Sequence, residues 1–345
     1  MLQDLNIEEV KALYFNENAL REPAYRLSRI DGNDIRYYYD IDELGQITYY
    51  PSWTSVINKI EPTPLDLIKW MCELGWEKSV EQRDLRAEYG TCMHILIAHF
   101  LLKKEFNTDS SNIWNILIES NIKLSYFKSF WINDLAKDLT SFVQFANDVE
   151  LEPFAIEIPL ISRAFGVAGT IDLVCRMNWQ GKRTMAIVDF KSGKKGVFES
   201  SEMQLKAYEL MWNENFQDTK IEQLFNWNPK EFRTKNATYT LTNQTDKHLE
   251  REIQIDVEKF KLRFPIKPSP KLQITGTLKL GRDINYINIV GIDEIIKNKQ
   301  KIPAPTPTFI NSDGEIESEM DIDFFSTLGK SLKPEHVVSN NFLEF

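Results

Sequence analysis

Hydrophobic residues follow two different periods along this chain. Between about residues 54 and 148 they recur every three or four positions, which is the spacing of helices that bury one face. Between residues 155 and 190 they form short runs rich in Val, Ile and Leu, which are typical of buried strands. The chain therefore changes from helices to strands near its middle.

A strand-like region precedes the helices. The segments 26–30, 35–40 and 46–50 carry aromatic and β-branched residues, and the turn-like sequences DGND and DELG separate them, so they predict a small strand meander. The predicted helices that follow span residues 54–60, 65–76, 79–104, 111–119 and 129–148.

The middle of the chain predicts adjacent antiparallel strands at 155–162, 167–176 and 185–190, with NWQGK as the turn between the last two. A helix at 200–215 and a strand at 224–228 come next. Helices followed by a β-β-β-α-β order favour an α/β fold in which helices flank a mixed central β-sheet.

The remaining segments predict a smaller appendage and a tail. TYTLT, a helix near 246–263, QITGTL and YINIV suggest ordered structure, whereas three prolines and an acidic cluster after residue 300 give no core-forming pattern. We therefore divide the chain into a β-rich amino-terminal extension with a strand-and-helix character (1–50), a core (51–230), a carboxyl-terminal appendage packed on the core (231–299) and an acidic flexible tail (300–345).

Composition is that of a soluble protein. The chain has 345 residues, 42% of them hydrophobic and 27% charged, and it lacks an apolar run of about 18 residues that could span a bilayer, so we expect no membrane partner. The amino end, MLQDLNIEEVKALYF, lacks the layout of a secretory signal, and we expect a cytoplasmic protein. Cys72, Cys92 and Cys175 show no CxxC spacing, which excludes a four-thiolate metal centre.

The net charge of −10 is unusual for a protein that handles DNA. Half of the excess lies after residue 300, where eight acidic residues accompany three basic ones. Basic residues gather instead in two runs, at residues 182–206 and 259–282. Such runs are either contact surfaces for phosphates or solvated faces, and the sequence leaves both open.

Charged residues interrupt two of the apolar predicted strands. In VDFKSG, Asp189 and Lys191 share a strand face, while Phe190 points into the opposite layer. Asp172 lies in GTIDLV on the neighbouring strand, within cross-strand reach. Taken alone, an Asp two residues before a Lys is more often a surface ion pair. A buried carboxylate, however, needs a partner or a metal, and two carboxylates with a backbone carbonyl are the hard donors that Mg²⁺ or Mn²⁺ prefers.

Four separated motifs then appear in one order. They are Gly90-Thr91-x-x-His94, Gly169-Thr170-Ile171-Asp172, Asp189-Phe190-Lys191-Ser192-Gly193 and Gln204-Leu205-x-x-Tyr208. This set resembles the RecB-type nuclease branch of the PD-(D/E)XK superfamily over about residues 50–230. The resemblance implies a PD-(D/E)XK nuclease core and phosphodiester hydrolysis assisted by Mg²⁺ or Mn²⁺.

Carried over residue by residue, the resemblance implies a set of metal ligands. Asp172 and Asp189 would be the carboxylate ligands, the carbonyl of Phe190 would add an oxygen, and His94 would be the further ligand that marks this branch. In isolation, a histidine on the apolar face of a helix is more often a core residue. Glu157, on the preceding strand, matches a supporting acid of some relatives only vaguely.

The resemblance implies catalytic roles for three further side chains. Lys191 would orient the attacking water and offset charge on the phosphate. Gln204 and Tyr208, four residues apart and so on one helical face, would position the substrate or support the metal site. Together with Asp172 and Asp189, these residues form the predicted catalytic set.

The expected function is that of a deoxyribonuclease in replication or recombination, as an exonuclease or flap-type nuclease of a phage or mobile element. Its substrate would be DNA with single-stranded or duplex ends, and a helicase, a recombinase or a single-strand-binding protein could be its partner. No GxxxxGK[ST] loop is present, so no ATP-driven motor is expected. The alternative is a catalytically inactive nuclease fold that serves as a DNA-binding or scaffold module of a larger assembly.

Two further segments invite hypotheses about binding. Lys194, Lys195 and Phe198 would contact the backbone and stack the bases of a single-stranded end. The acidic tail could cover the basic channel as a DNA mimic or dock on a partner, or it could serve only as a solubilising tail.

Overall fold

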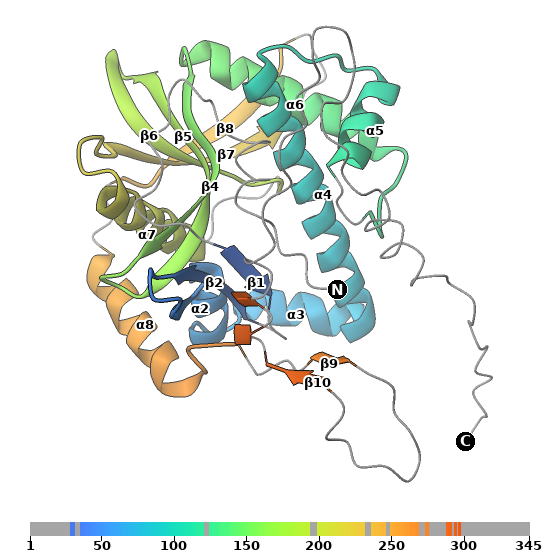
Figure 1. The fold of residues 1–345 in the computed structure, drawn as a ribbon. Helices are drawn as coiled ribbons and strands as arrows, with labels where there is room; N and C mark the ends of the chain where they lie inside the picture. The colour runs from blue at the N-terminus through green and yellow to red at the C-terminus, as the bar shows by residue number, and fades with distance from the viewer. Residues whose placement is uncertain are drawn as a thin grey trace, which may run out of the picture. The chain divides into compact units, whose positions relative to one another are not determined.

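A mixed five-stranded sheet forms the centre of the structure (Figure 1). The computed structural model describes residues 28–31, 35–120, 124–193, 199–231, 236–245 and 249–268, and the short stretches 273–275, 288–291, 293–294 and 296–297. The sheet's strands, in spatial as well as chain order, are β4 (Glu152–Ser162), β5 (Val167–Trp179), β6 (Lys182–Phe190), β7 (Gln223–Lys230) and β8 (Thr238–Asn243).

Neighbouring strands of this sheet are antiparallel, with one exception. β6 and β7 are parallel, and helix α7 (Glu199–Asn215) connects them. A parallel pair needs such a crossover, because a tight hairpin can join only antiparallel strands. The predicted β-β-β-α-β order and the mixed α/β sheet are confirmed.

Helices cover both faces of the sheet and form two hydrophobic layers (Figure 1). The α4 layer packs α4 (Trp76–Lys103), α5 (Ser110–Glu119) and α6 (Trp131–Asp148) on one face. The α7 layer packs α2 (Trp53–Ile60), α7 and α8 (Glu250–Arg263) on the other. α3 (Leu65–Leu74) lies between α2 and α4 in the chain and buries no residue. The predicted helices are confirmed, with shifts of a few residues at their ends.

A small antiparallel sheet of β1 (Ser28–Asp31), β2 (Arg36–Ile41) and β3 (Ile47–Pro51) precedes the helices, as the sequence predicts. Tyr38 and Tyr50 of this sheet are buried against Ile161, near the end of β4, and Ala168, near the start of β5. The hydroxyls of Tyr38 and Thr170 lie 2.7 Å apart. The amino-terminal sheet therefore packs directly on a strand of the central sheet.

Side-chain alternation on β4 and β5 is interrupted near the middle of each strand. On β4, Ile156 packs in the α4 layer while Ile158 packs in the α7 layer. On β5, Leu173 and Ile171 divide between the layers in the same way. Residues two apart on a regular strand share a face, so both strands change face at the residue in between. On β4 that residue is Glu157, whose φ of 50° is in the left-handed region.

The chain divides into two compact units, residues 1–270 and 271–345. β8 and α8 belong to the first unit, where they complete the sheet and the α7 layer. In the second unit, β9 (Gln273–Thr275) and β10 (Asn288–Val290) pair antiparallel. The expected flexible tail lies outside the described residues, and the domain boundaries at 50, 230 and 299 stay predictions. Within the described part of the chain, no helix has the length and apolar character needed to cross a membrane.

Candidate metal and catalytic site

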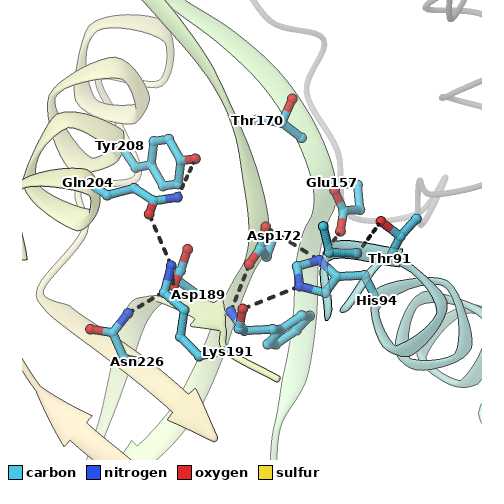
Figure 2. A network of polar contacts seen from close by, with 12 residues as sticks. Thr91, His94, Glu157, Thr170, Asp172, Asp189, Lys191, Gln204, Tyr208 and Asn226 are labelled. Carbon is cyan, nitrogen blue, oxygen red and sulfur yellow. Dashed lines mark hydrogen bonds and ion pairs between the residues drawn. The ribbon is translucent and has the colours of Figure 1, made fainter. Parts of the chain in front are cut away.

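Four polar residues form one row across neighbouring strands of the central sheet (Figure 2). Ile156 pairs with Leu173 and Ile158 with Ile171, so the register places Glu157 on β4 opposite Asp172 on β5. Leu173 pairs with Val188, and the same register brings Asp189 of β6 next in the row. Asn226 on β7 pairs with Asp189 in the parallel register. The row lies at the level where β4 and β5 change face, so side chains from both helical layers can reach it.

Helix α4 brings His94 to the Glu157 end of this row. The Nδ1 atom of His94 lies 2.9 Å from Oε1 of Glu157 and 3.7 Å from Oδ1 of Asp172. Its Nε2 atom lies 3.3 Å from the carbonyl oxygen of Phe190. The second oxygen of Asp172 accepts a hydrogen bond of 2.7 Å from the Phe190 backbone N–H. The imidazole therefore joins β4, β5 and β6 at one point.

His94, Glu157 and Asp172 form a group that can hold a metal ion. One ligand atom from each lies within 4.8 Å of the others. The side chain of Glu157 is 20% exposed and that of His94 is 26% exposed, so the group is open to solvent on one side. Two carboxylates, an imidazole and the nearby Phe190 carbonyl fit Mn²⁺, and the oxygen donors among them also fit Mg²⁺.

Protons are held tightly in this group. Burial by itself would lower the pKa of His94, but the charges of Asp172, Glu157 and Asp189 raise it to about 9. Burial raises the pKa of Asp172, His94 opposes the rise, and Asp189 and Glu157 add to it, so that the pKa reaches about 8. Without a cation, the group therefore keeps protons at neutral pH that the isolated side chains would have lost.

Asp189 begins a second chain of contacts, on the α7 side of the row (Figure 2). Its Oδ2 atom lies 2.7 Å from the ammonium of Lys191. Lys191 donates to Oε1 of Gln204 at 3.0 Å, and Gln204 donates to the hydroxyl of Tyr208 at 2.8 Å. Gln204 and Tyr208 occupy successive turns of α7. The sequence-predicted catalytic residues on β6 and α7 are thus directly connected.

The charge states on this side are fixed by the same contacts. Burial alone would lower the pKa of Lys191, but the contact with Asp189 and the charge of Asp172 raise it above its ordinary value. Burial, together with the charges of Asp172 and Asp189, raises the pKa of Tyr208 well above its ordinary value. Lys191 therefore carries a positive charge at neutral pH, and Tyr208 keeps its proton.

Two motif glycines allow close approach between elements of the site. A Cβ atom on Gly169 would lie 2.6 Å from Cε1 of Tyr208, so the Tyr208 ring rests directly on the backbone of β5. A Cβ atom on Gly90 would lie 3.2 Å from Oγ of Ser192. Gly90 thus lets α4 approach the segment that follows Asp189 and Lys191.

The structure brings together the seven residues that the sequence singles out as ligands or catalytic groups, which are His94, Asp172, Asp189, Phe190, Lys191, Gln204 and Tyr208 (Figure 2). Within the described residues, the cluster with metal-ligand spacing contains Glu157 in the place expected for Asp189. Asp189 instead contacts Lys191 and Asn226. The motif residue Thr91 bonds to the Ala87 carbonyl of its own helix.

Sequence reasoning gave no role to Asn226 and Asn228. Asn226 donates to Asp189, and Asn228 donates to the carbonyl oxygens of Lys191 and Gly193. The sequence contains a pattern that could have identified them, because the two amides alternate with aromatic residues in the strand segment FNWN. A polar side chain at every second position of a buried strand has to find partners on one face.

The first basic run does not supply free charge in the part that the structure describes. Lys182 pairs with Glu222, and Arg183 pairs with Glu152. Lys206 contacts Glu209 and Glu250. The ion pairs of the exposed Lys182 and Arg183 favour the solvated-face interpretation for those two residues, whereas Lys206 is buried. Lys194, Lys195 and Phe198, proposed from the sequence to contact DNA, lie outside the described residues.

The comparisons with known proteins do not assign the chain to a family. No protein-family model matches the sequence, and no curated protein matches it. The function is therefore inferred from the fold and from the residues of the site.

Proposed function

We propose that this protein is a metal-dependent deoxyribonuclease that hydrolyses phosphodiester bonds of DNA, with a PD-(D/E)XK core of the RecB type. The observation that carries the proposal is the placement of two groups side by side at the central sheet. One is the cluster of His94, Glu157 and Asp172, and the other is the Asp189–Lys191 pair. A scaffold protein has no need for several carboxylates gathered in a buried row, because such groups cost stability.

The residues present fit a divalent cation. Carboxylate oxygens and a backbone carbonyl suit Mg²⁺ or Mn²⁺, and the imidazole of His94 favours Mn²⁺. Glu157, Asp172 and His94 would hold the cation, with the Phe190 carbonyl as a further donor and Asp189 next in the row. When bound, the cation would withdraw charge from the phosphate and lower the pKa of a water molecule.

The chain's own residues would position the reactants. Lys191 carries its positive charge in direct contact with Oδ2 of Asp189. A water molecule at the other oxygen of Asp189 would donate to that carboxylate, while the ammonium would face a phosphate oxygen. Gln204 accepts from Lys191 and fixes the direction of its ammonium. Tyr208 holds the Gln204 amide in turn. An exonuclease or flap-type nuclease of DNA replication or recombination is the form of the activity that we propose, with DNA ends as substrate.

The test is cleavage of labelled linear, circular and flap DNA in Mg²⁺ or Mn²⁺. Wild-type protein should cut the linear or flap substrates, and Asp189→Asn should lose at least about a hundredfold in rate. Asp256→Asn is the matched control, because Asp256 is also a buried carboxylate but lies on α8 beside Lys259. If no substrate is cut and no cation is taken up, the alternative of an inactive DNA-binding or scaffold module replaces the proposal.

A further inference from the structure

Strand β7 places its aromatic and amide side chains on opposite faces. Phe225 and Trp227 pack in the α4 layer. Asn226 and Asn228, on the alternate face, make their contacts with residues of the site. β7 is the parallel neighbour of β6, and Asn226 pairs with Asp189. Asn228, two residues further along β7, therefore lies beside the residues that follow the end of β6.

Asn226 is fully buried, and within the described residues its side chain makes one hydrogen bond, to the carboxylate of Asp189. Its Nδ2 atom donates to Oδ2 of Asp189 at 2.9 Å. The same oxygen lies 2.7 Å from the ammonium of Lys191. Two donors on Oδ2 fix the rotation of the carboxylate, and among the described residues Oδ1 of Asp189 accepts no hydrogen bond. One oxygen of Asp189 is thus held by the protein, and the other stays available.

The amide oxygen of Asn226 also indicates that the residue serves as a donor to Asp189. Its Oδ1 atom is buried and has no hydrogen-bond partner within the described part of the chain. A buried amide oxygen without a partner costs stability, and an apolar side chain of the same shape would avoid that cost. The opposite orientation of the amide would place its oxygen against Oδ2 of Asp189, which is two acceptors in contact. Asn226 therefore contributes a single donor, aimed at Asp189.

Asn228 acts on the backbone rather than on a side chain. Its Nδ2 atom donates to the carbonyl of Gly193 at 2.8 Å and to that of Lys191 at 3.3 Å. The Lys191 backbone N–H also donates to the carbonyl of Trp227 at 2.9 Å. Three hydrogen bonds between β7 and the segment just after the end of β6, two donated by Asn228 and one accepted by Trp227, thus hold the backbone that carries the Lys191 side chain.

We propose that Asn226 and Asn228 are positioning residues of the nuclease site: Asn226 orients the carboxylate of Asp189, and Asn228 fixes the backbone that carries Lys191. The inference rests on the proposed function. Asn226 leaves Oδ1 of Asp189 free for a cation or a water molecule, while Asn228 sets the place of the Lys191 ammonium. The two amides therefore affect different steps, cation binding for Asn226 and turnover for Asn228.

The experiment compares the full-length wild-type protein with Asn226→Leu, Asn226→Val and Asn228→Ala. Leu has nearly the shape of Asn, Val is smaller, and neither side chain can donate a hydrogen bond. Asn178→Ala is the control, because it removes an asparagine on β5 that donates to Glu150 away from the site. Each protein is assayed for Mn²⁺ affinity by calorimetry, for kcat and KM on labelled linear DNA, and for Tm.

Both Asn226 variants should weaken Mn²⁺ binding by about tenfold or more and lower kcat, because Asp189 loses one of the two donors that fix its orientation. Asn228→Ala should lower kcat by about tenfold with an unchanged Mn²⁺ affinity. If Asn226→Leu does not fold, the smaller Asn226→Val decides. Asn226 variants that fold and keep wild-type Mn²⁺ affinity and kcat overturn the inference. The inference is also overturned if the variants only have a lower Tm and keep wild-type Mn²⁺ affinity and kcat at temperatures below that Tm.

Failure of the inference and failure of the proposed function give different results. If the wild-type protein cuts DNA and Asp189→Asn does not, the proposed function stands whatever the Asn226 variants do. If the wild-type protein binds Mn²⁺ but cuts no DNA, the nuclease proposal fails, and the calorimetry still decides whether Asn226 orients Asp189. If the wild-type protein neither binds Mn²⁺ nor cuts DNA, both are overturned.

Discussion

Glu157 and Asp172 lie opposite each other on β4 and β5, and both carboxylates approach Nδ1 of His94, at 2.9 and 3.7 Å. The left-handed φ of Glu157 accompanies this arrangement. A non-glycine residue in that region carries backbone strain, which is commonly kept at functional sites. The pair thus marks the place where the backbone of β4 departs from regular strand geometry.

Removal of the Glu157 carboxylate should weaken cation binding while the fold is kept. Glu157→Gln loses one negative charge from the ligand group, and we expect Mn²⁺ affinity to fall by about tenfold or more. Calorimetric titration with Mn²⁺ measures this directly. Glu152→Gln, on the same strand but paired with Arg183 at the surface, should bind Mn²⁺ as the wild type does. Equal affinities of the two variants would remove Glu157 from the ligand set.

The stability of the metal-free protein should fall as the pH rises from neutral to alkaline. The folded-state pKa values of Asp172 and His94 are raised to about 8 and about 9, above the ordinary values of 3.8 and 6.5. A raised pKa gives stability that is complete below the unfolded-state pKa and is lost as the pH passes the folded-state pKa. The Tm in chelator should therefore decrease between pH ~6 and ~9.

Thermal unfolding in chelator across that pH range checks this expectation. Mn²⁺ should oppose the loss, because a cation takes the place of the protons and stabilises the folded state by mass action. His94→Gln should flatten the pH dependence, since one of the two titrating groups is gone. A wild-type Tm that rises over the same interval would contradict the assignment of the raised pKa values.

A methyl group on Gly169 should disturb the Tyr208 ring. The added Cβ atom would lie 2.6 Å from Cε1 of a buried aromatic ring, which cannot move aside easily. We expect Gly169→Ala to cost about 1–3 kcal/mol of stability and to lower activity, because the Gln204 amide loses its neighbour. Urea unfolding measures the first effect. Gly193→Ala is the control, since its added Cβ atom meets no atom within 4 Å, and a similar cost in both variants would argue against the close contact.

Loss of the Gln204 side-chain amide should reduce turnover more than cation binding. In Gln204→Leu, Lys191 keeps its contact with Asp189 but loses the acceptor that fixes its direction. We expect kcat to fall by about tenfold, while the Mn²⁺ concentration that gives half-maximal activity (the Mn²⁺ midpoint) stays constant. Gln144→Leu, which removes a surface hydrogen bond to Asp148, is the matched control for stability. A shifted Mn²⁺ midpoint without a change in kcat would instead place Gln204 in the ligand set.

The sequence predicted most elements of the fold because each has a clear period. The helical spacing in α4 and α6 and the apolar runs of β4, β5 and β6 are local properties of the chain. The two-residue period of a strand also placed Asp189 and Lys191 together and Phe190 in the opposite layer, as the structure has them. These predictions depend only on neighbours in sequence.

Other features of the site could not be predicted, because they depend on register and on local distortion. The match of Glu157 to a supporting acid was vague, since its place beside His94 follows from its φ of 50° and its position opposite Asp172. Neither property is visible in the sequence EIPL. The partner of Asn226 was equally hidden, because it depends on the parallel register of β6 and β7, which pairs Asn226 with Asp189.

The change of face on β4 and β5 means that each of these strands belongs to both hydrophobic layers. Ile156 and Ile158 are two residues apart on β4, yet one is held by the helices around α4 and the other by those around α7. A change of side-chain volume in either layer would therefore tilt the segment between them and alter the spacing of Glu157 and His94. Core substitutions far from any substrate should thus act as activity variants, and screens for loss of function would recover them alongside the ligands themselves.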